Sequence, residues 1–254
     1  REGQDDKEGA VRMKWNHQYI INSTLKGEHA FLENNVLRLN WSAVLSKAYS
    51  ETPDNTEIYM QGTHLQNTNS AIRRWEHNSD KDKAGYVDLM YKWNLGGGSV
   101  LDFSVGGMYR DKKRDSFFNE YTFDSATGSK DPQYQGTDWN NYDELLFAAR
   151  KYGNISDPLN YDATEKIGAG YGMVKYTYGR WELIGGVRVE HTNQGYTLKF
   201  PTESADPKGN QKYTDVLPSF HAKYGVHENA NLRLSYARSI NRPSFFEIVP
   251  YSII

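Results

Sequence analysis

Residues 213–240, YTDVLPSFHAKYGVHENANLRLSYARSI, decide the fold class. Two runs in which apolar and polar residues alternate flank the short polar link 227–230. The apolar positions share one parity in each run: Val216, Pro218, Phe220, Ala222, Tyr224 and Val226, then Leu232, Leu234, Tyr236 and Ile240. Successive side chains of a strand point to opposite faces, so this alternation predicts an antiparallel hairpin with one apolar and one polar face.

The same alternation recurs along the chain. Strands are predicted in 15–31 and 37–46, in 87–95 and 101–110 around the turn 96–99, and in 166–200 around the turn 178–180. Together with 213–240 these make about eight strands in four hairpins. The links within hairpins are tight, whereas the connections 50–84, 112–165 and 201–212 are long and polar.

This regular exchange of short and long links is typical of outer-membrane barrels, which have short periplasmic turns and long extracellular loops. Aromatic residues make up 14% of the chain and hydrophobic residues only 37%, which suits half-apolar spanning strands with aromatic girdles better than spanning helices. We therefore predict an all-β, antiparallel, up-and-down transmembrane β-barrel segment in the bacterial outer membrane. Its predicted lipid-facing residues include Leu37, Leu39, Trp41, Leu101, Phe103, Leu183, Val187, Leu232 and Leu234.

Alternative folds remain open at this point. A soluble extracellular β-sandwich, such as a glycan-binding module, would bury the same apolar residues between two sheets. A small closed barrel of eight strands would fill its interior with side chains such as Arg38, Lys92, Arg188 and Arg233. A glycosidase is the weakest alternative, because it rests only on acidic and aromatic loops.

The sequence alone does not decide the conformation at two positions. Apolar residues change parity between Met173 and Val174, which indicates either a β-bulge or one apolar set that faces the barrel interior. Pro218 removes a ladder donor and is therefore expected near the outer end of its strand.

The predicted orientation places both chain ends on the outside. A strand edge exposed to lipid cannot stay unpaired, because its N–H and C=O groups would find no water. We therefore expect residues 1–254 to be part of one larger outer-membrane β-barrel domain, with the plug domain and the remaining strands elsewhere.

Residues 213–251 resemble the mid-barrel region of TonB-dependent outer-membrane receptors of the Bacteroidetes type. The resemblance rests on Val216-Leu217-Pro218-Ser219, on Leu232-Arg233-Leu234-Ser235-Tyr236-Ala237-Arg238, and on Asn241-Arg242-Pro243-Ser244-Phe245-Phe246-Glu247. Residues 185–190 resemble the preceding strand of that family. In the family, the Arg-Pro-Ser-Phe-like element leads into an extracellular loop.

The resemblance implies a barrel of about 22 strands with a plugged lumen. It implies import of a scarce nutrient, such as an iron chelate, a cobalamin or a glycan. The implied partners are outer-membrane lipid, the nutrient, the TonB complex acting through N-terminal parts outside this chain, and a surface lipoprotein. No catalysis and no cofactor are implied.

Two loop stretches are candidate ligand-binding sites. Arg73-Arg74-Trp75 offers guanidinium donors for an anionic chelate, and Trp139-Asn140 with Tyr142 mixes aromatic and amide groups as sugar-binding loops do. An ordinary salt-bridged or aromatic-anchored loop is the simpler explanation of each stretch.

Other chemistries find no support in the sequence. Cysteine is absent, the net charge of -2 comes with no basic block for nucleic acid, and the seven histidines show no paired metal spacing. The run Asp80-Lys81-Asp82-Lys83 lacks the glycine and the closing glutamate of a calcium loop.

Overall fold

The computed structural model describes residues 8–32, 36–61, 64–65, 70–126, 147–149, 159–201 and 206–250. In these residues ten strands form one antiparallel sheet in the order β1-β2-β4-β5-β7-β8-β9-β10, with β3 added to β2 and β6 to β5. The strands are β1 (Glu8–Phe31), β2 (Leu37–Gln61), β3 (His64–Leu65), β4 (Ala71–Gly96), β5 (Ser99–Ser125), β6 (Phe147–Ala149), β7 (Tyr161–Tyr178), β8 (Trp181–Leu198), β9 (Lys208–His227) and β10 (Ala230–Ala237). One short helix, α1 (Phe245–Ile248), follows them.

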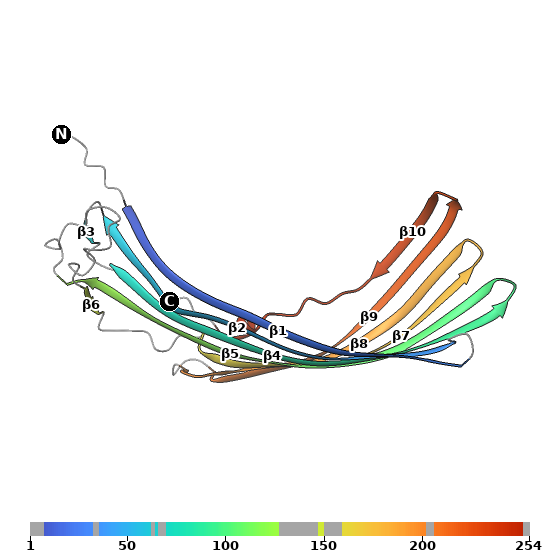
Figure 1. Cartoon of the computed structure of the whole chain (residues 1–254), viewed down its shortest axis with the longest axis horizontal. Helices are drawn as coiled ribbons and strands as arrows, with labels where there is room; N and C mark the ends of the chain where they lie inside the picture. Colours follow the sequence, from blue (N-terminus) through green and yellow to red (C-terminus); the bar gives the residue numbers. More distant parts are fainter. Residues whose placement is uncertain are drawn as a thin grey trace.

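The sheet is a long curved trough whose tight links all lie at one end (Figure 1). The links β4–β5, β7–β8 and β9–β10 are two-residue turns, and glycines with positive φ occupy the first two of them at Gly97, Gly98 and Gly179. The predicted all-β, up-and-down barrel segment of about eight strands in four hairpins is confirmed. In the described part of the chain, no helix is long and apolar enough to cross a membrane.

The strands run much further than the alternation of the sequence indicated. Residues 50–84 and 112–165 were expected to be loops, but β2 continues to Gln61, β4 begins at Ala71, β5 continues to Ser125 and β7 begins at Tyr161. The apolar alternation disappears in these extensions because polar side chains occupy both faces. The long connections are therefore shorter, and the wall taller, than predicted.

A β-bulge divides β2 into two parts. The pairing with β4 advances three residues in β2, from Thr52 to Asn55, but only two in β4, and the pairing with β1 shifts in the same way between Glu51 and Asp54. One extra residue is therefore accommodated around Pro53. A bulge tolerates proline because a residue there is left out of the ladder. Beyond the bulge the faces of β2 are exchanged, so that Glu57 points inward and Ile58 outward.

The outward face carries an apolar band next to the tight turns. The register aligns its residues in rows across the sheet; one row reads Leu37, Tyr91, Phe103, Val174, Gly185, Phe220 and Tyr236, and another reads Leu39, Leu89, Val105, Gly172, Val187 and Pro218. In β8 the band extends from Trp181 to Val189, about 26 Å along the strand. Outer-membrane barrels have an apolar band about 25 Å tall.

None of the nine predicted lipid-facing residues is buried; Leu232 and Leu234 are 67% and 66% exposed. The sandwich alternative, which required these residues to be buried between sheets, is therefore wrong. The small closed barrel is wrong as well, since β1 and β10 form the two separate edges of the sheet in the described residues.

The parity change in β7 is not a bulge. The register of β7 with β5 and with β8 is continuous from Tyr161 to Tyr178. Tyr171 donates a hydrogen bond of 2.7 Å to the Asp88 carboxylate on the inward face, so Ile167, Tyr171 and Met173 point inward and Val174 points outward. The second reading of the sequence holds, because apolar side chains occupy both faces of this strand.

Pro218 lies in the middle of β9, paired with Val187, and not near a strand end as expected. Its carbonyl accepts the N–H of Arg238 at 3.1 Å, on the β10 side. The N–H and C=O of one strand residue point to the same side, so the missing donor also faces β10. The β8–β9 ladder loses nothing, and β10 ends at this level.

A charged side chain on the outward face should destabilise the protein, because lipid surrounds that face. Val187→Arg in the full-length protein is expected to lower the free energy of unfolding in lipid vesicles by about 2–3 kcal/mol. Ser219→Arg, on the inward face of the neighbouring strand, should change it by less than about 0.5 kcal/mol. Denaturant titration of vesicle-reconstituted protein measures both, and equal effects would contradict the assignment of the faces.

Candidate functional site

Opposite charges pair across the strands on the inward face beyond the apolar band. Arg114 forms two hydrogen bonds of 2.7 Å with the Asp80 carboxylate, and Arg110 pairs with Asp82. Burial alone would raise the pKa of Asp80, but Arg114 and Lys112 together outweigh it and the pKa is lowered. The Asp80 bond is also the first cause of the raised pKa of Arg114. These charged groups are paired with one another, so they stabilise the wall and are not free to bind a ligand.

After β10 the chain leaves the wall and crosses its concave side (Figure 1). Alternation explains this exit. If β10 continued, Arg238 would point outward beside Pro218, in the same row as Leu39 and Val187, and a guanidinium would enter the lipid. The chain turns inward instead, and residues 241–249, here called the strap, lie over β8 and β7.

Polar contacts hold the first part of the strap. Arg242 pairs with Glu190, which also receives a bond from Arg188, and Arg242 Nε donates to Thr192 Oγ1 at 3.2 Å. Glu190 and Thr192 are buried. The buried Glu190 carboxylate is thus shared between two arginines, one from the wall and one from the strap.

Gln194 is the second polar anchor and is only 1% exposed. Its amide nitrogen donates to Glu165 at 2.8 Å and to the Pro243 carbonyl at 3.1 Å. Its oxygen accepts bonds from Gln211 and Tyr213. Every hydrogen-bonding position of this amide is filled, so the strap is connected to three strands through one side chain.

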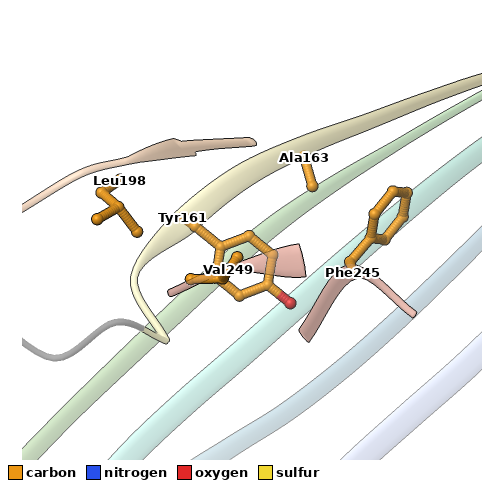
Figure 2. Packing of buried hydrophobic residues seen from close by; sticks show 5 residues of the cluster. All are labelled: Tyr161, Ala163, Leu198, Phe245 and Val249. Carbon is orange, nitrogen blue, oxygen red and sulfur yellow. The ribbon is translucent and has the colours of Figure 1, made fainter. Parts of the chain in front are cut away.

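Phe245 is the apolar anchor of the strap. Its ring is 5% exposed and packs with Val249 in a cluster that β7 and β8 complete through Tyr161, Ala163 and Leu198, as Figure 2 shows. Lys112 Nζ and Arg114 Cζ lie 5.3 and 5.4 Å from the ring centroid. The aromatic face therefore also contacts the inward-facing cations of β5.

The strap reveals residues that the sequence did not single out. The Arg-Pro-Ser-Phe element lies on the inward face, and the loop into which it was expected to lead lies outside the described residues. Its partners Glu190, Thr192 and Gln194 lie in the predicted strand region 166–200 and were not singled out as site residues. Their common parity on β8 was the one available signal.

The candidate residues Arg73, Arg74 and Trp75 lie on β4 and not in a loop. Arg73 points outward, where it binds Asp54 through two hydrogen bonds and lies 5.1 Å from the Trp75 ring. Arg74 points inward and pairs with Glu120 and Glu57. Adjacent strand residues face opposite ways, so the three do not form one site.

Arg73 lines an outward recess of about 620 Å³ at the far end of the wall. Buried Ile58 and Ala71 form its floor together with Phe123 and Phe147. The other predicted ligand-binding residues, Trp139, Asn140 and Tyr142, lie outside the described residues.

An open sheet with a lipid-facing band, a paired-charge inward face and an internal strap defines the wall of an outer-membrane β-barrel. Residues 150–254 match a family described as "Outer membrane protein beta-barrel family", which confirms the predicted outer-membrane location. No curated protein matches the chain.

Two solved structures share the fold. The unliganded ferric citrate transporter FecA is 13% identical, with a TM-score of 0.56 over 87% of this chain and 27% of its own. The siderophore receptor PiuA from Acinetobacter baumannii is 16% identical, with a TM-score of 0.60 over 88% of this chain and 32% of its own. The present chain therefore spans about a third or less of either structure.

Removing the apolar anchor should loosen the strap locally. Phe245→Ala is expected to cost about 3 kcal/mol of local stability and to speed amide hydrogen exchange in residues 241–249 roughly a hundredfold. Phe246→Ala provides the matched control, because the neighbouring ring is 47% exposed and its loss should speed exchange less than about fivefold. Equal exchange in the two variants would show that Phe245 does not hold the strap.

Proposed function

We propose that residues 1–254 are part of the wall and loops of one larger barrel domain, in a TonB-dependent receptor that imports a scarce nutrient. The family match of residues 150–254 and the shared fold with FecA and PiuA support this proposal. Those two proteins are described as a ferric citrate transporter and a siderophore receptor.

One observation carries the proposal: the apolar band continues to both edges of an open sheet. β1 and β10 each have one unpaired side in the described residues, and outward Leu25, Leu232 and Leu234 lie on these edge strands. Unpaired N–H and C=O groups in lipid each cost several kcal/mol, so further strands must flank both sides. In the proposed domain these further strands close the sheet into a wide barrel that holds a plug.

We assign the tight turns to the periplasmic side and the long connections to the outside. The extended upper parts of β2, β4 and β5 then stand above the membrane as a rigid collar. Their inward faces, with paired charges such as Arg74–Glu120, line the entrance through which a ligand passes.

This segment performs no covalent chemistry in the proposed role. Ligand capture is assigned to Trp139, Asn140 and Tyr142 in the longest connection. Of the three candidates on the collar, Arg74 is assigned to the entrance, and Arg73, with Trp75 beside it, to the outward recess. The nutrient is an iron chelate, a cobalamin or a glycan. The TonB complex acts through N-terminal parts of the full-length protein, and a surface lipoprotein assists capture.

Uptake by cells that carry the full-length protein tests the proposal. Radiolabelled ferric citrate, a ferric siderophore, cobalamin and an oligosaccharide are each offered to cells with and without the TonB complex. One ligand class should accumulate at least tenfold more when TonB is present. Accumulation that is independent of TonB, or equally slow for all four, would contradict a TonB-dependent receptor.

Binding measurements on the full-length protein test the loop residues. The double variant Trp139→Ala with Tyr142→Ala should weaken the binding of the transported ligand at least tenfold, because aromatic anchors dominate recognition surfaces. Trp181→Ala, at the tight-turn end, is the matched control and should leave the affinity within about twofold. Unchanged affinity of the double variant would remove these residues from the site.

A further inference from the structure

The side chains of the run Asp80-Lys81-Asp82-Lys83 alternate between the inward and outward faces of β4. Asp80 and Asp82 point inward, where Arg114 and Arg110 pair with them. Lys81 and Lys83 therefore point outward. At this position along the strands, the inward-facing cations form ion pairs with carboxylates, whereas the outward-facing lysines do not.

Six exposed lysines occupy the outward face at this level. We call them the lysine belt: Lys47 of β2, Lys81 and Lys83 of β4, Lys113 of β5, Lys166 of β7 and Lys212 of β9. In the described residues none of the six forms an ion pair with a carboxylate. Asp111, between Lys83 and Lys166, is the one acidic side chain in the two rows that hold the belt.

Three belt lysines stand directly beside one another. Lys47 pairs in register with Lys81, and Lys81 with Lys113. Directly opposed side chains on adjacent strands are about 5 Å apart at Cβ, and like charges there destabilise the sheet. On the inward face of the same strands this repulsion is relieved by aspartates. On the outward face Lys47 Nζ lies 5.7 Å from the Tyr19 ring, and an anion from outside the chain would relieve the remaining repulsion.

The position of the belt identifies that anion. Lys47 lies two residues beyond the apolar Leu45, and Lys83 and Lys212 lie four residues beyond Val87 and Val216, all on the outward face. At about 3.3 Å per residue the belt begins 7–13 Å past the apolar band. Lysine stems reach further along an apolar surface towards headgroups.

We propose that the lysine belt binds the phosphate groups of lipid headgroups in the leaflet that surrounds the long-connection end of the wall. Five strands contribute lysines to one extended surface, which suits a row of lipids and not a single small ion. In the orientation proposed above this is the outer leaflet. The proposal rests on the outer-membrane location and is independent of which nutrient is imported.

The test uses the full-length protein, freed of lipid in a neutral detergent. Lipid A with two phosphates is titrated in, and bound lipid is counted by native mass spectrometry. A lysine near an anionic surface contributes a factor of about five in affinity, so Lys81→Gln with Lys113→Gln should weaken binding about twenty-five-fold. The wild-type affinity should also fall with added salt.

The matched control removes two lysines from the inward face. Lys26→Gln with Lys223→Gln makes the same change of charge and should leave lipid binding within about twofold. Dephosphorylated lipid A should bind the wild type at least as weakly as lipid A binds the belt variant, because that variant keeps four belt lysines. Retained heat resistance of the folded barrel on gels verifies that each variant is folded.

Two results would overturn the proposal. Equal lipid A affinity of the belt variant and the wild type would show that the lysines are merely solvated. Displacement of lipid A by pyrophosphate at equal concentration would assign the belt to free phosphate and not to lipid. Loss of nutrient uptake with lipid binding intact would leave the belt assignment standing.

Discussion

Every backbone N–H and C=O group inside a lipid bilayer needs a partner in the protein, and this constraint governs the wall. The ladders from β1 to β9 are continuous throughout the apolar band. The bulge at Pro53 stands beyond the band, whereas Pro218 lies within it and turns its missing donor to the side on which β10 ends. Both prolines are therefore accommodated without an unpaired group in a β8–β9 or β2–β4 ladder.

The two-residue period of a strand distributes chemistry between the faces. Along β4 it sends aspartates to the interior and lysines to the exterior from one short run of sequence, and along β7 it places Tyr171 inside and Val174 outside. The strap follows from the same period, because one further outward position in β10 would carry Arg238 into lipid. Local alternation thus determines where a long-range internal contact begins.

The sequence could predict strands only where apolar and polar residues alternate. The hairpins and their outward residues were predictable because one face is apolar, as at Leu37, Leu39 and Leu234. The extensions of β2 and β5 were not, since water on both faces removes the signal. The contacts of Arg242 with Glu190 and of Phe245 with Tyr161 join residues far apart in the chain, and no local pattern contains such information.

Because of the bulge at Pro53, the number of residues in β2 determines which side chains beyond the bulge face inward. Deleting one residue there would restore the original parity, bringing Ile58 and Met60 into the entrance and moving Asn55 and Glu57 to the outer surface. A single insertion or deletion in β2 can thus exchange the side chains that line the entrance with those on the outer surface of this strand. Relatives with the same side chains but a different register at this position would present different surfaces to a ligand.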